Sequence, residues 1–452
     1  MKRTLADVAA ACGGTLHGTD RAFTAVSSDS RTLSRGDLFV ALRGPSFNGN
    51  DFLSAAFSAG AVGALVDALQ PVAIAQIVVA DTQAALERLG HAWRTQFTIP
   101  FVGVAGSNGK TTAKEMTAAI LGQMGECLAT RGNLNNHIGV PLTLLRVEAR
   151  HRSAVIEMGA NRAGEVAALV RIAAPTVGLI TNAGAEHLEG FGSLEGVARA
   201  EGEMVAGLTS EATAVINADD PFAAMWRAAT PARVVTFGIE QRADFMAQGL
   251  QTQVDQQGFH TRFTLKSPAG ETAVELQVGG RHNVANALAA AAAALSAGAR
   301  LEHVAPGLRT LRAVPGRLQF KTTSGGAWLI DDSYNANPSS VRAGIETLAQ
   351  LDGRKWLVLG DMAELGSHAE NSHAEIGAFA REHGVERLFA MGTLAALAAE
   401  SFGSGGQYFA DAATMTDALR DATPDVRMLV KGSRVNRLER VVNALTQQTG
   451  GH

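Results

Sequence analysis

The chain has 452 residues, of which 46% are hydrophobic and 18% are charged, and its formal net charge is −4. This length exceeds one ordinary hydrophobic core and predicts two to four globular domains. The slightly negative charge gives no general attraction to nucleic acid or anionic membranes. Two cysteines rule out a disulfide framework, and no apolar run is long enough for a signal peptide or a membrane span. We therefore expect a cytoplasmic enzyme.

Short apolar strands alternate with helical segments along the first two thirds of the chain, which predicts α/β domains over residues 1–97 and 98–313. The period changes to two over Asp244–Val278, which predicts an antiparallel flank, and a helix is expected over Asn283–Ala297. The other predicted strands are Leu38–Leu42, Ala64–Val66, Ile77–Val79, Ile99–Ala105, Ser153–Glu157, Gly178–Thr181 and Ala214–Asn217. The other predicted helices are Asp51–Gly60, Thr82–Phe97 and Lys110–Met124.

A linker at Ala313–Arg317 precedes a third α/β alternation, so we expect a third domain over residues 314–452. Its predicted strands are Trp328–Asp331, Trp356–Leu359, Arg387–Met391 and Arg427–Val430. No internal repeat of fixed period is visible.

The most informative motif is Gly103–Thr112, which reads Gly-Val-Ala-Gly-Ser-Asn-Gly-Lys-Thr-Thr between a predicted strand and a predicted helix. Gly106 and Gly109 allow a tight loop that turns several backbone N–H groups toward an anion at the helix N-terminus. Lys110 can then reach the β- and γ-phosphates, and the Thr111 hydroxyl can ligate Mg²⁺. Position 104 is valine rather than the glycine of the strict pattern. An ordinary glycine-rich turn is the alternative, but Gly-Lys-Thr at a helix start favours binding of ATP or GTP.

Polar residues follow the next predicted strands at the same edge of the sheet. Glu157 ends one strand and His187 lies just past another, where open α/β sheets bind their ligands. Magnesium prefers hard oxygen ligands such as Glu157. A single histidine in a loop is more often structural, so His187 is either a residue of the ligand site or a structural residue.

Three later segments are candidates with structural alternatives. Asn283 opens a predicted helix and either reads an adenine edge or caps the helix. Arg317 in the linker either brings a charge to a transferring phosphoryl group or is a surface arginine. Asp331–Pro338 has two acids and two asparagines between a strand and a helix that can begin at Pro338. This segment is either a polar site or a turn with a cap.

Taken together and in this order, these motifs resemble the Mur ligase family over essentially the whole chain. The motifs are Gly106–Thr112, Glu157–Gly159, His187, Gly280–Asn283, Pro315–Arg317 and Asp331–Pro338. Further segments resemble the branch of the family that attaches D-alanyl-D-alanine; these are Gly132–Pro141, Glu186–Ser193, Asp332–Asn337, Gly360–Gly366 and Leu429–Arg434.

The resemblance implies an α/β protein of three domains. A central P-loop-type parallel-sheet ATPase domain is flanked by an N-terminal UDP-sugar-binding domain and a C-terminal Rossmann-like domain. The implied reaction uses ATP and Mg²⁺. The terminal carboxylate of UDP-N-acetylmuramoyl-tripeptide becomes an acyl phosphate, and the amine of D-alanyl-D-alanine displaces phosphate to give the pentapeptide precursor of peptidoglycan. The implied protein is a monomer without nucleic-acid partners or membrane insertion.

The resemblance also assigns roles to residues. The ATP phosphates would contact Gly106, Ser107, Asn108, Gly109, Lys110, Thr111 and Thr112. Thr111 and Glu157 would hold Mg²⁺, and His187 would lie beside a second metal ion. Asn283 would contact adenine, while Arg317 and Asp332 would approach ATP and act with Lys110, Glu157 and His187 in catalysis. Substrate would contact Ser28, Asp29, Ser30, Arg31, Asn135, Asn136, Tyr334, Asn335 and Asn337. Asn48-Gly49-Asn50 departs from the Asp-Gly-His that the family often has.

Glu201 is a second departure, because the family usually has Lys-Gly-Glu where this chain reads Glu201-Gly202-Glu203. The family lysine reacts with CO₂ to form a carbamate near the second metal ion. One hypothesis is that Glu201 supplies that carboxylate directly, through a water if needed. The alternative is a solvated helix residue.

Three rival functions remain open. A sibling amide ligase, such as a tripeptide-forming or folylpolyglutamate enzyme, shares the loop but lacks the motifs at 133–136 and 332–337. A P-loop kinase or regulatory ATPase would not need both peptide substrates for phosphate release. A non-catalytic binding module is disfavoured by the intact Lys110, Thr111 and Glu157.

Overall fold

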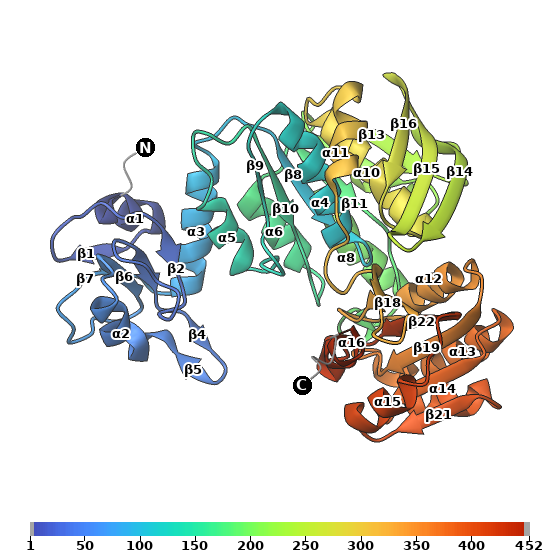
Figure 1. Ribbon diagram of the computed structural model, residues 1–452. Coiled ribbons are helices and arrows are strands. Elements are labelled where there is room, and N and C mark those ends of the chain that lie inside the picture. Colours follow the sequence, from blue (N-terminus) through green and yellow to red (C-terminus); the bar gives the residue numbers. More distant parts are fainter. Residues whose placement is uncertain (1–3, 447–452) are drawn as a thin grey trace.

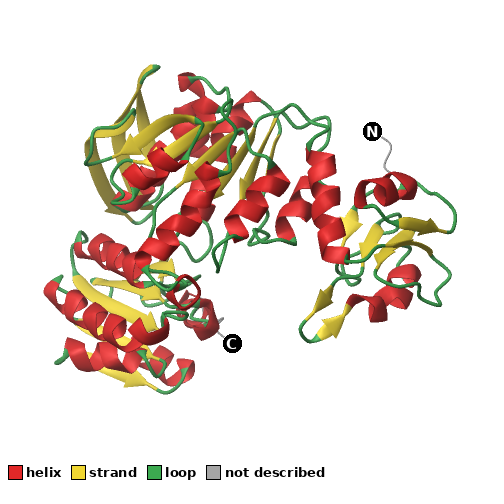
Figure 2. Cartoon of the chain, turned by 180° about the vertical axis from the view of Figure 1, so that it is seen from behind, coloured by secondary structure: helices red, strands yellow, loops and turns green. Residues whose placement is uncertain are grey.

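The computed structural model describes residues 4–446, which form three α/β domains in chain order (Figure 1). The N-terminal and C-terminal domains flank the central domain both in this view and from behind (Figure 2). Within residues 4–446, no helix combines the length and the apolar character needed to cross a membrane.

The N-terminal domain is a sheet of five strands in the order β1-β7-β6-β3-β2, parallel except for β1. The strands are β1 Thr15–His17, β2 Val26–Ser27, β3 Leu38–Val40, β6 Gly63–Val66 and β7 Ala75–Val78, with a separate hairpin of β4 Arg43–Gly44 and β5 Phe47–Asn48. Helices α1 Leu5–Cys12 and α3 Thr82–Arg94 pack on one face, and α2 Leu53–Ser58 packs on the other. The predicted strands and helices of this region are confirmed, whereas α1, β1, β2 and the β4–β5 hairpin were not predicted.

The central sheet has nine strands in the order β16-β15-β14-β13-β12-β11-β8-β10-β9. Its parallel part contains β8 Phe101–Ala105, β9 Cys127–Ala129, β10 Ser153–Glu157, β11 Val177–Ile180, β12 Thr213–Asn217 and β13 Arg233–Gly238. The strands β14 Phe245–Asp255, β15 Gly258–Ser267 and β16 Gly270–Leu276 extend one side. Since β14–β15 and β15–β16 pair antiparallel, the predicted antiparallel flank is confirmed.

Helices cover both faces of the central sheet. On one face lie α4 Lys110–Leu121, α10 Arg281–Ser296 and α11 Val304–Thr310. On the other lie α5 Gly139–Leu144, α6 Glu165–Ala173, α8 Leu194–Ala206 and α9 Ala223–Ala229, and the short α7 Leu188–Phe191 precedes α8. Strand β8 is fully buried between β10 and β11, so the loop that follows it opens at the middle of the sheet.

Helix α3 joins the first two domains, because it also packs on α5 and α6. The Trp93 indole donates a hydrogen bond to the Val147 carbonyl at 3.0 Å. The Arg94 guanidinium donates to the carbonyls of Ala173 and Ala174, both at 2.8 Å, at the end of α6. Burial lowers the pKa of Arg94 to about 10. The last carbonyl groups of a helix have no hydrogen-bond donor within the helix, and here the Arg94 guanidinium is the donor.

The C-terminal sheet has six strands in the order β17-β18-β22-β19-β20-β21, parallel except for β17. The strands are β17 Gln319–Thr322, β18 Trp328–Asp332, β19 Arg354–Gly360, β20 Arg387–Met391, β21 Gly406–Phe409 and β22 Val426–Lys431. Helices α12 Pro338–Ala349, α13 Ala369–Glu382 and α14 Ala395–Phe402 cover one face, and α15 Ala412–Leu419 and α16 Glu439–Thr446 cover the other. The predicted start of a helix at Pro338 is confirmed.

Close contact between α11 and α4 gives a test of the packing. A Cβ atom added to Gly307 would lie 2.6 Å from the Cα of Ile120. We expect Gly307→Ala to lower the free energy of unfolding by about 1–3 kcal/mol, because backbone rather than a flexible side chain must move. Urea unfolding measures this change.

Gly122→Ala is the matched control, because it lies at the end of α4 with helical φ and no atom within 4 Å of an added Cβ. We expect it to be neutral or slightly stabilising. If the free energy of unfolding fell equally in the two variants, the loss in Gly307→Ala would not come from the close packing of α11 on α4.

Candidate active site

The loop between β8 and α4 is shaped by two glycines. Gly106 and Gly109 have φ angles of 121° and 81°, which favour glycine. A Cβ at Gly106 would lie 2.1 Å from the Thr181 hydroxyl oxygen, and one at Gly109 would lie 2.3 Å from Oδ1 of Asn286. The predicted strand, glycine loop and helix are therefore confirmed, and both glycines are needed for conformation and for space.

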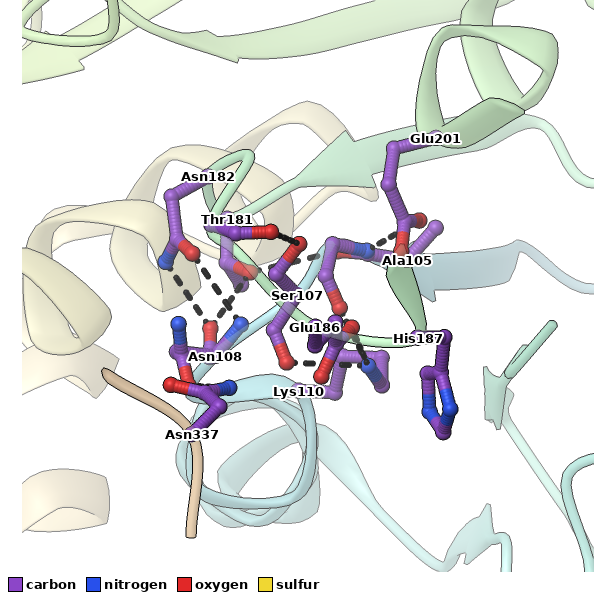
Figure 3. A network of polar contacts seen from close by, with 12 residues as sticks. Ala105, Ser107, Asn108, Lys110, Thr181, Asn182, Glu186, His187, Glu201 and Asn337 are labelled. Carbon is purple, nitrogen blue, oxygen red and sulfur yellow. Dashed lines mark hydrogen bonds and ion pairs between the residues drawn. The ribbon is translucent and has the colours of Figure 1, made fainter. Parts of the chain in front are cut away.

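Lys110 begins α4 and folds back over this loop (Figure 3). Its Nζ donates to the carbonyl oxygens of Gly106 and Ser107, the latter at 3.1 Å, and lies 3.2 Å from Oε1 of Glu186. Burial favours the neutral amine, but nearby carboxylates, with Glu186 first, outweigh burial and raise the pKa of Lys110. A charged ammonium is therefore held at the loop.

Glu201 is buried on α8 and contacts the loop backbone. Its Oε2 accepts a hydrogen bond of 2.7 Å from the backbone N–H of Gly106 (Figure 3). Burial raises the pKa of Glu201 to about 7, although Lys110 opposes this shift. The alternative that Glu201 is a solvated helix residue is therefore wrong, because packing of α8 against the sheet brings its carboxyl group to the loop.

Glu157 ends β10 with its carboxylate buried. Its Oε1 accepts a hydrogen bond of 2.9 Å from the Asn135 amide, whereas no residue of 4–446 hydrogen-bonds the buried Oε2. An unpartnered buried carboxylate oxygen is costly unless a cation or donor satisfies it. Thr111, in the first turn of α4, is also buried. The second carboxylate oxygen of Glu157 is therefore a suitable ligand for a divalent cation.

The predicted metal residues do not form one cluster. No group of three or more His, Cys, Asp and Glu side chains within the described part of the chain is arranged to hold a metal ion. His187 has a positive φ of 48°, and its Nδ1 is paired with Glu364 of the C-terminal domain. Figure 3 shows the His187 ring outside the contacts around Lys110. The metal role of His187 stays a prediction.

Asn108 connects the loop to the C-terminal domain. Its side-chain Nδ2 donates to the Ser339 hydroxyl at 2.9 Å, and its Oδ1 accepts from the Asn337 amide at 2.9 Å. Its backbone is held at the end of β11, where its carbonyl accepts from Thr181 at 2.7 Å and from Asn182 at 2.9 Å. The position of the loop therefore depends on both domains.

Arg317 and Asp332 lie at the start of the C-terminal domain. The guanidinium carbon of Arg317 is 4.4 Å from the ring centroid of Tyr334, a cation–π contact. Asp332 Oδ2 accepts a hydrogen bond of 2.6 Å from Nζ of Lys431, and the same Nζ donates to the carbonyl of Asn335 at 3.0 Å. The structure thus gathers the predicted residues of this segment around one lysine and one aromatic ring.

Asn283 occupies the third position of α10, after the cap residue Gly280. The cap alternative for Asn283 is therefore wrong, since the helix begins two residues earlier than predicted. Its Nδ2 donates to the Gly279 carbonyl at 2.7 Å, and its Oδ1 accepts from Asn286 at 3.3 Å. Asn286 in turn lies against Gly109, so Asn283 is linked to the loop through one side chain.

Of the other predicted substrate residues, some belong to the N-terminal domain and others form hydrogen bonds with neighbouring protein groups. The segment Ser28–Arg31 follows β2 in the N-terminal domain, where the Arg31 hydrogen bonds lower the pKa of Asp29 to about 2. Asn136 Oδ1 accepts from the N–H of Gly139 at 2.9 Å at the start of α5. At the departure Asn48–Asn50, the Asn50 amide donates to Asp67 at 2.7 Å.

Sequence reasoning gave no site role to several residues that contact the loop or the Asp332 segment, although Glu186 and Lys431 lie within motifs that it singled out. The residues are Asn182, Glu186, Asn286, Ser339 and Lys431. Asn182 and Lys431 lie at strand ends, so the position of ligands at the carboxyl edge of parallel sheets was a usable signal. Asn286 and Ser339 lie inside helices and had no comparable signal.

Three family models match successive parts of the chain. They are the Mur ligase family catalytic domain over residues 22–94, the Mur ligase middle domain over 104–294, and the Mur ligase glutamate ligase domain over 316–434.

Curated relatives match over the full length. The UDP-N-acetylmuramoyl-tripeptide–D-alanyl-D-alanine ligase of Escherichia coli strain K12 is 42% identical over 98% of both chains. The ligase of the same name from Bacillus subtilis strain 168 is 36% identical over 99% of both.

Solved structures agree with this match. A crystal structure of MurF from Acinetobacter baumannii superposes with a TM-score of 0.93 at 34% identity over 99% of both chains. The MurF ligase from Thermotoga maritima in complex with ADP has a TM-score of 0.83 at 27% identity, covering 93% of this chain and 97% of that one.

The contact between Asn108 and Asn337 can be tested without losing the helix cap. Asn337→Asp keeps the oxygen that accepts from the Ser340 N–H but removes the amide that donates to Asn108. Two acceptors then face each other, so we expect the KM for ATP to rise about tenfold, the loss expected for one unmade buried hydrogen bond. Steady-state ADP formation measures it.

Ser340→Ala is the control, because within residues 4–446 the Ser340 hydroxyl hydrogen-bonds only to the backbone N–H and carbonyl of Asn337 and not to its side chain. We expect its KM for ATP to stay near the wild-type value. If Asn337→Asp also left the KM unchanged, the contact would have no part in nucleotide binding.

Glu201 predicts a pH dependence of stability. The pKa of Glu201 is about 7 in the folded protein, against 4.5 for an ordinary glutamate, so the folded protein keeps a proton that the unfolded chain loses as pH rises between these values. Wild-type stability should therefore fall by up to about 3 kcal/mol over this range. Glu201→Gln keeps an acceptor for Gly106 and should remove this fall.

Urea unfolding at pH 5 and pH 7.5 makes the comparison. Glu195→Gln, an exposed position on the same helix, is the control and should keep the wild-type slope. If the free energy of unfolding changed equally with pH in wild type and in Glu201→Gln, the pH dependence would not come from the raised pKa of Glu201.

Proposed function

Because the chain belongs to the Mur ligase family, we propose that it joins D-alanyl-D-alanine to UDP-N-acetylmuramoyl-tripeptide at the expense of ATP. The full-length relatives carry this activity in their names. The observation that carries the proposal is the charged Lys110 in a glycine loop whose Asn108 is held by the C-terminal domain. This arrangement supports a nucleotide site that a second domain completes, as a reaction between two large substrates requires.

We propose that the ATP phosphates lie on the N–H groups of the loop and α4, next to Lys110. The positive end of the α4 dipole and the ammonium both favour an anion there. Thr111 and the unpartnered oxygen of Glu157 would hold Mg²⁺, which supplies charge neutralisation for the phosphates. Asn283 would reach the adenine.

The amide bond would form in two steps. An oxygen of the tripeptide carboxylate attacks the γ-phosphorus, and ADP leaves. The amine of D-alanyl-D-alanine then attacks the acyl carbon, phosphate leaves with the bonding electron pair, and the amine loses a proton. Arg317 and Lys110 would stabilise the charge on the transferred phosphoryl group. Close docking of the C-terminal domain on the loop would keep water from the acyl phosphate.

The N-terminal residues Ser28–Arg31 would bind the nucleotide-sugar, and Asn135, Asn136, Tyr334, Asn335 and Asn337 would contact the peptide. Several of these side chains already form hydrogen bonds with other residues; the Asn135 amide, for example, donates to Glu157. They would therefore position residues of the site as well as contact substrate. We further propose a cytoplasmic location, where ATP is available; the monomeric state stays a prediction.

The proposal is tested by phosphate release with Lys110→Ala. We expect omission of either UDP-N-acetylmuramoyl-tripeptide or D-alanyl-D-alanine to stop wild-type phosphate release. Lys110→Ala should lower kcat by about 100-fold or more, the loss typical for one group that stabilises transition-state charge.

Lys266 lies on the antiparallel flank, and within residues 4–446 its ammonium forms an ion pair with Glu271 alone, so Lys266→Ala should retain wild-type kcat. Circular dichroism checks that both variants are folded. ATP hydrolysis without the peptide substrates would favour a regulatory ATPase, and a fully active Lys110→Ala would refute the nucleotide site.

A further inference from the structure

Lys114 is a buried lysine that the proposed mechanism does not use. It lies in α4, one turn after Lys110, and its side chain is only 1% exposed. Its Nζ donates to the Thr130 carbonyl at 2.8 Å and lies 2.5 Å from Oε1 of Glu115. Burying an ammonium group is costly, and apolar side chains of similar volume often stabilise a fold at least as well as a buried ion pair. A need to fill space therefore does not explain an ammonium group here.

Thr130, the residue that Lys114 contacts, is the first residue after the edge strand β9 (Figure 1). Its N–H donates to the Val155 carbonyl at 3.1 Å, and its hydroxyl oxygen accepts from the Glu157 N–H at 3.0 Å. Val155 and Glu157 both belong to β10, so Lys114 ties Thr130 to a second element, the helix α4. Hydrogen bonds to two elements thus fix the point at which the chain leaves the sheet.

The chain that continues from Thr130 returns to β10 at Asn135. The Asn135 carbonyl accepts from the Gly159 N–H at 2.9 Å, and the Asn135 amide donates to Oε1 of Glu157 at 2.9 Å. A Cβ atom added to Gly159 would lie 2.8 Å from Nδ2 of Asn135, so the fit is close. Glu157 is therefore held at its N–H by Thr130 and at its carboxylate by Asn135. Movement of Thr130 would change both contacts.

We propose that Lys114 is a positioning residue, which fixes Thr130 and thereby the orientation of Glu157 and Asn135. The inference rests on the proposed function, in which Glu157 holds Mg²⁺ and Asn135 contacts the peptide substrate. An ammonium group suits this place, because a charge-assisted hydrogen bond is about twice as strong as one between neutral groups. An apolar side chain would remove this donor from the buried Thr130 carbonyl.

Lys114→Met tests the contact, because methionine has a similar length and offers no donor. Amide hydrogen exchange over residues 130–138 should become about tenfold faster, as expected when one such hydrogen bond is lost. The KM for UDP-N-acetylmuramoyl-tripeptide and the Mg²⁺ concentration for half-maximal turnover should each rise about tenfold. When both are saturating, kcat should stay near the wild-type value, because Lys110 keeps its contacts with the loop.

Thr117→Val is the matched control. Thr117 is also fully buried on α4, and its hydroxyl donates to the Ala113 carbonyl of the same helix. Exchange over residues 130–138 and all kinetic constants should stay near the wild-type values in this variant.

A second pair of variants tests the next contact without removing a buried charge. Thr130→Val deletes the oxygen that accepts from the Glu157 N–H, so it should reproduce the rise in the KM for UDP-N-acetylmuramoyl-tripeptide and in the Mg²⁺ requirement. Thr130→Ser keeps this oxygen and should retain the wild-type constants. If Lys114→Met did not fold, this pair would decide, and equal constants in Thr130→Val and Thr130→Ser would overturn the proposal.

Faster exchange in Lys114→Met with an unchanged KM and Mg²⁺ requirement would show that Lys114 is purely structural, which also overturns the proposal. Equal losses in Lys114→Met and Thr117→Val would do the same, because they would come from the packing of α4. Wild-type enzyme that released no phosphate with both peptide substrates would refute the proposed function. The exchange measurement needs no substrate, so it would still test whether Lys114 holds Thr130.

Discussion

The structure of the site depends on the charge balance at Lys110. One ammonium lies among the carboxylates of Glu157, Glu186 and Glu201 and the carbonyls of Gly106 and Ser107. The carboxylates keep the lysine charged despite burial, and the lysine in turn limits the cost of burying them. An incoming polyanion would compete with these carboxylates for the ammonium. The loop is thus held ready by internal partners that a phosphate can replace.

The same loop joins two domains. Its backbone is fixed by β11 through Thr181 and Asn182, while the Asn108 side chain is fixed by the start of α12. Movement of the C-terminal domain would therefore remove two hydrogen bonds from the loop. This gives a direct physical route from domain position to nucleotide affinity, with no need for a longer chain of contacts.

Local charge matters more here than the net charge of −4, which alone predicts no affinity for anions. Cationic groups lie beside segments that follow parallel strands, with Lys110 after β8 in the central domain and Arg317 against Tyr334, after β18, in the C-terminal domain. Concentrating cations at these segments allows polyanionic substrates to meet despite their repulsion.

The sequence by itself determined the features that depend on neighbouring residues. Alternation of strands and helices predicted the parallel sheets, the period-two segment predicted the antiparallel flank, and Gly-Lys-Thr predicted the loop, because each reports backbone conformation over a few residues. Only the tertiary structure decided which distant groups meet. Packing buried Glu201 against Gly106 and paired His187 with Glu364. It also left one oxygen of Glu157 without a partner among residues 4–446 and made α3 part of two domains. These contacts join residues that are far apart in the chain, so no local sequence pattern predicts them.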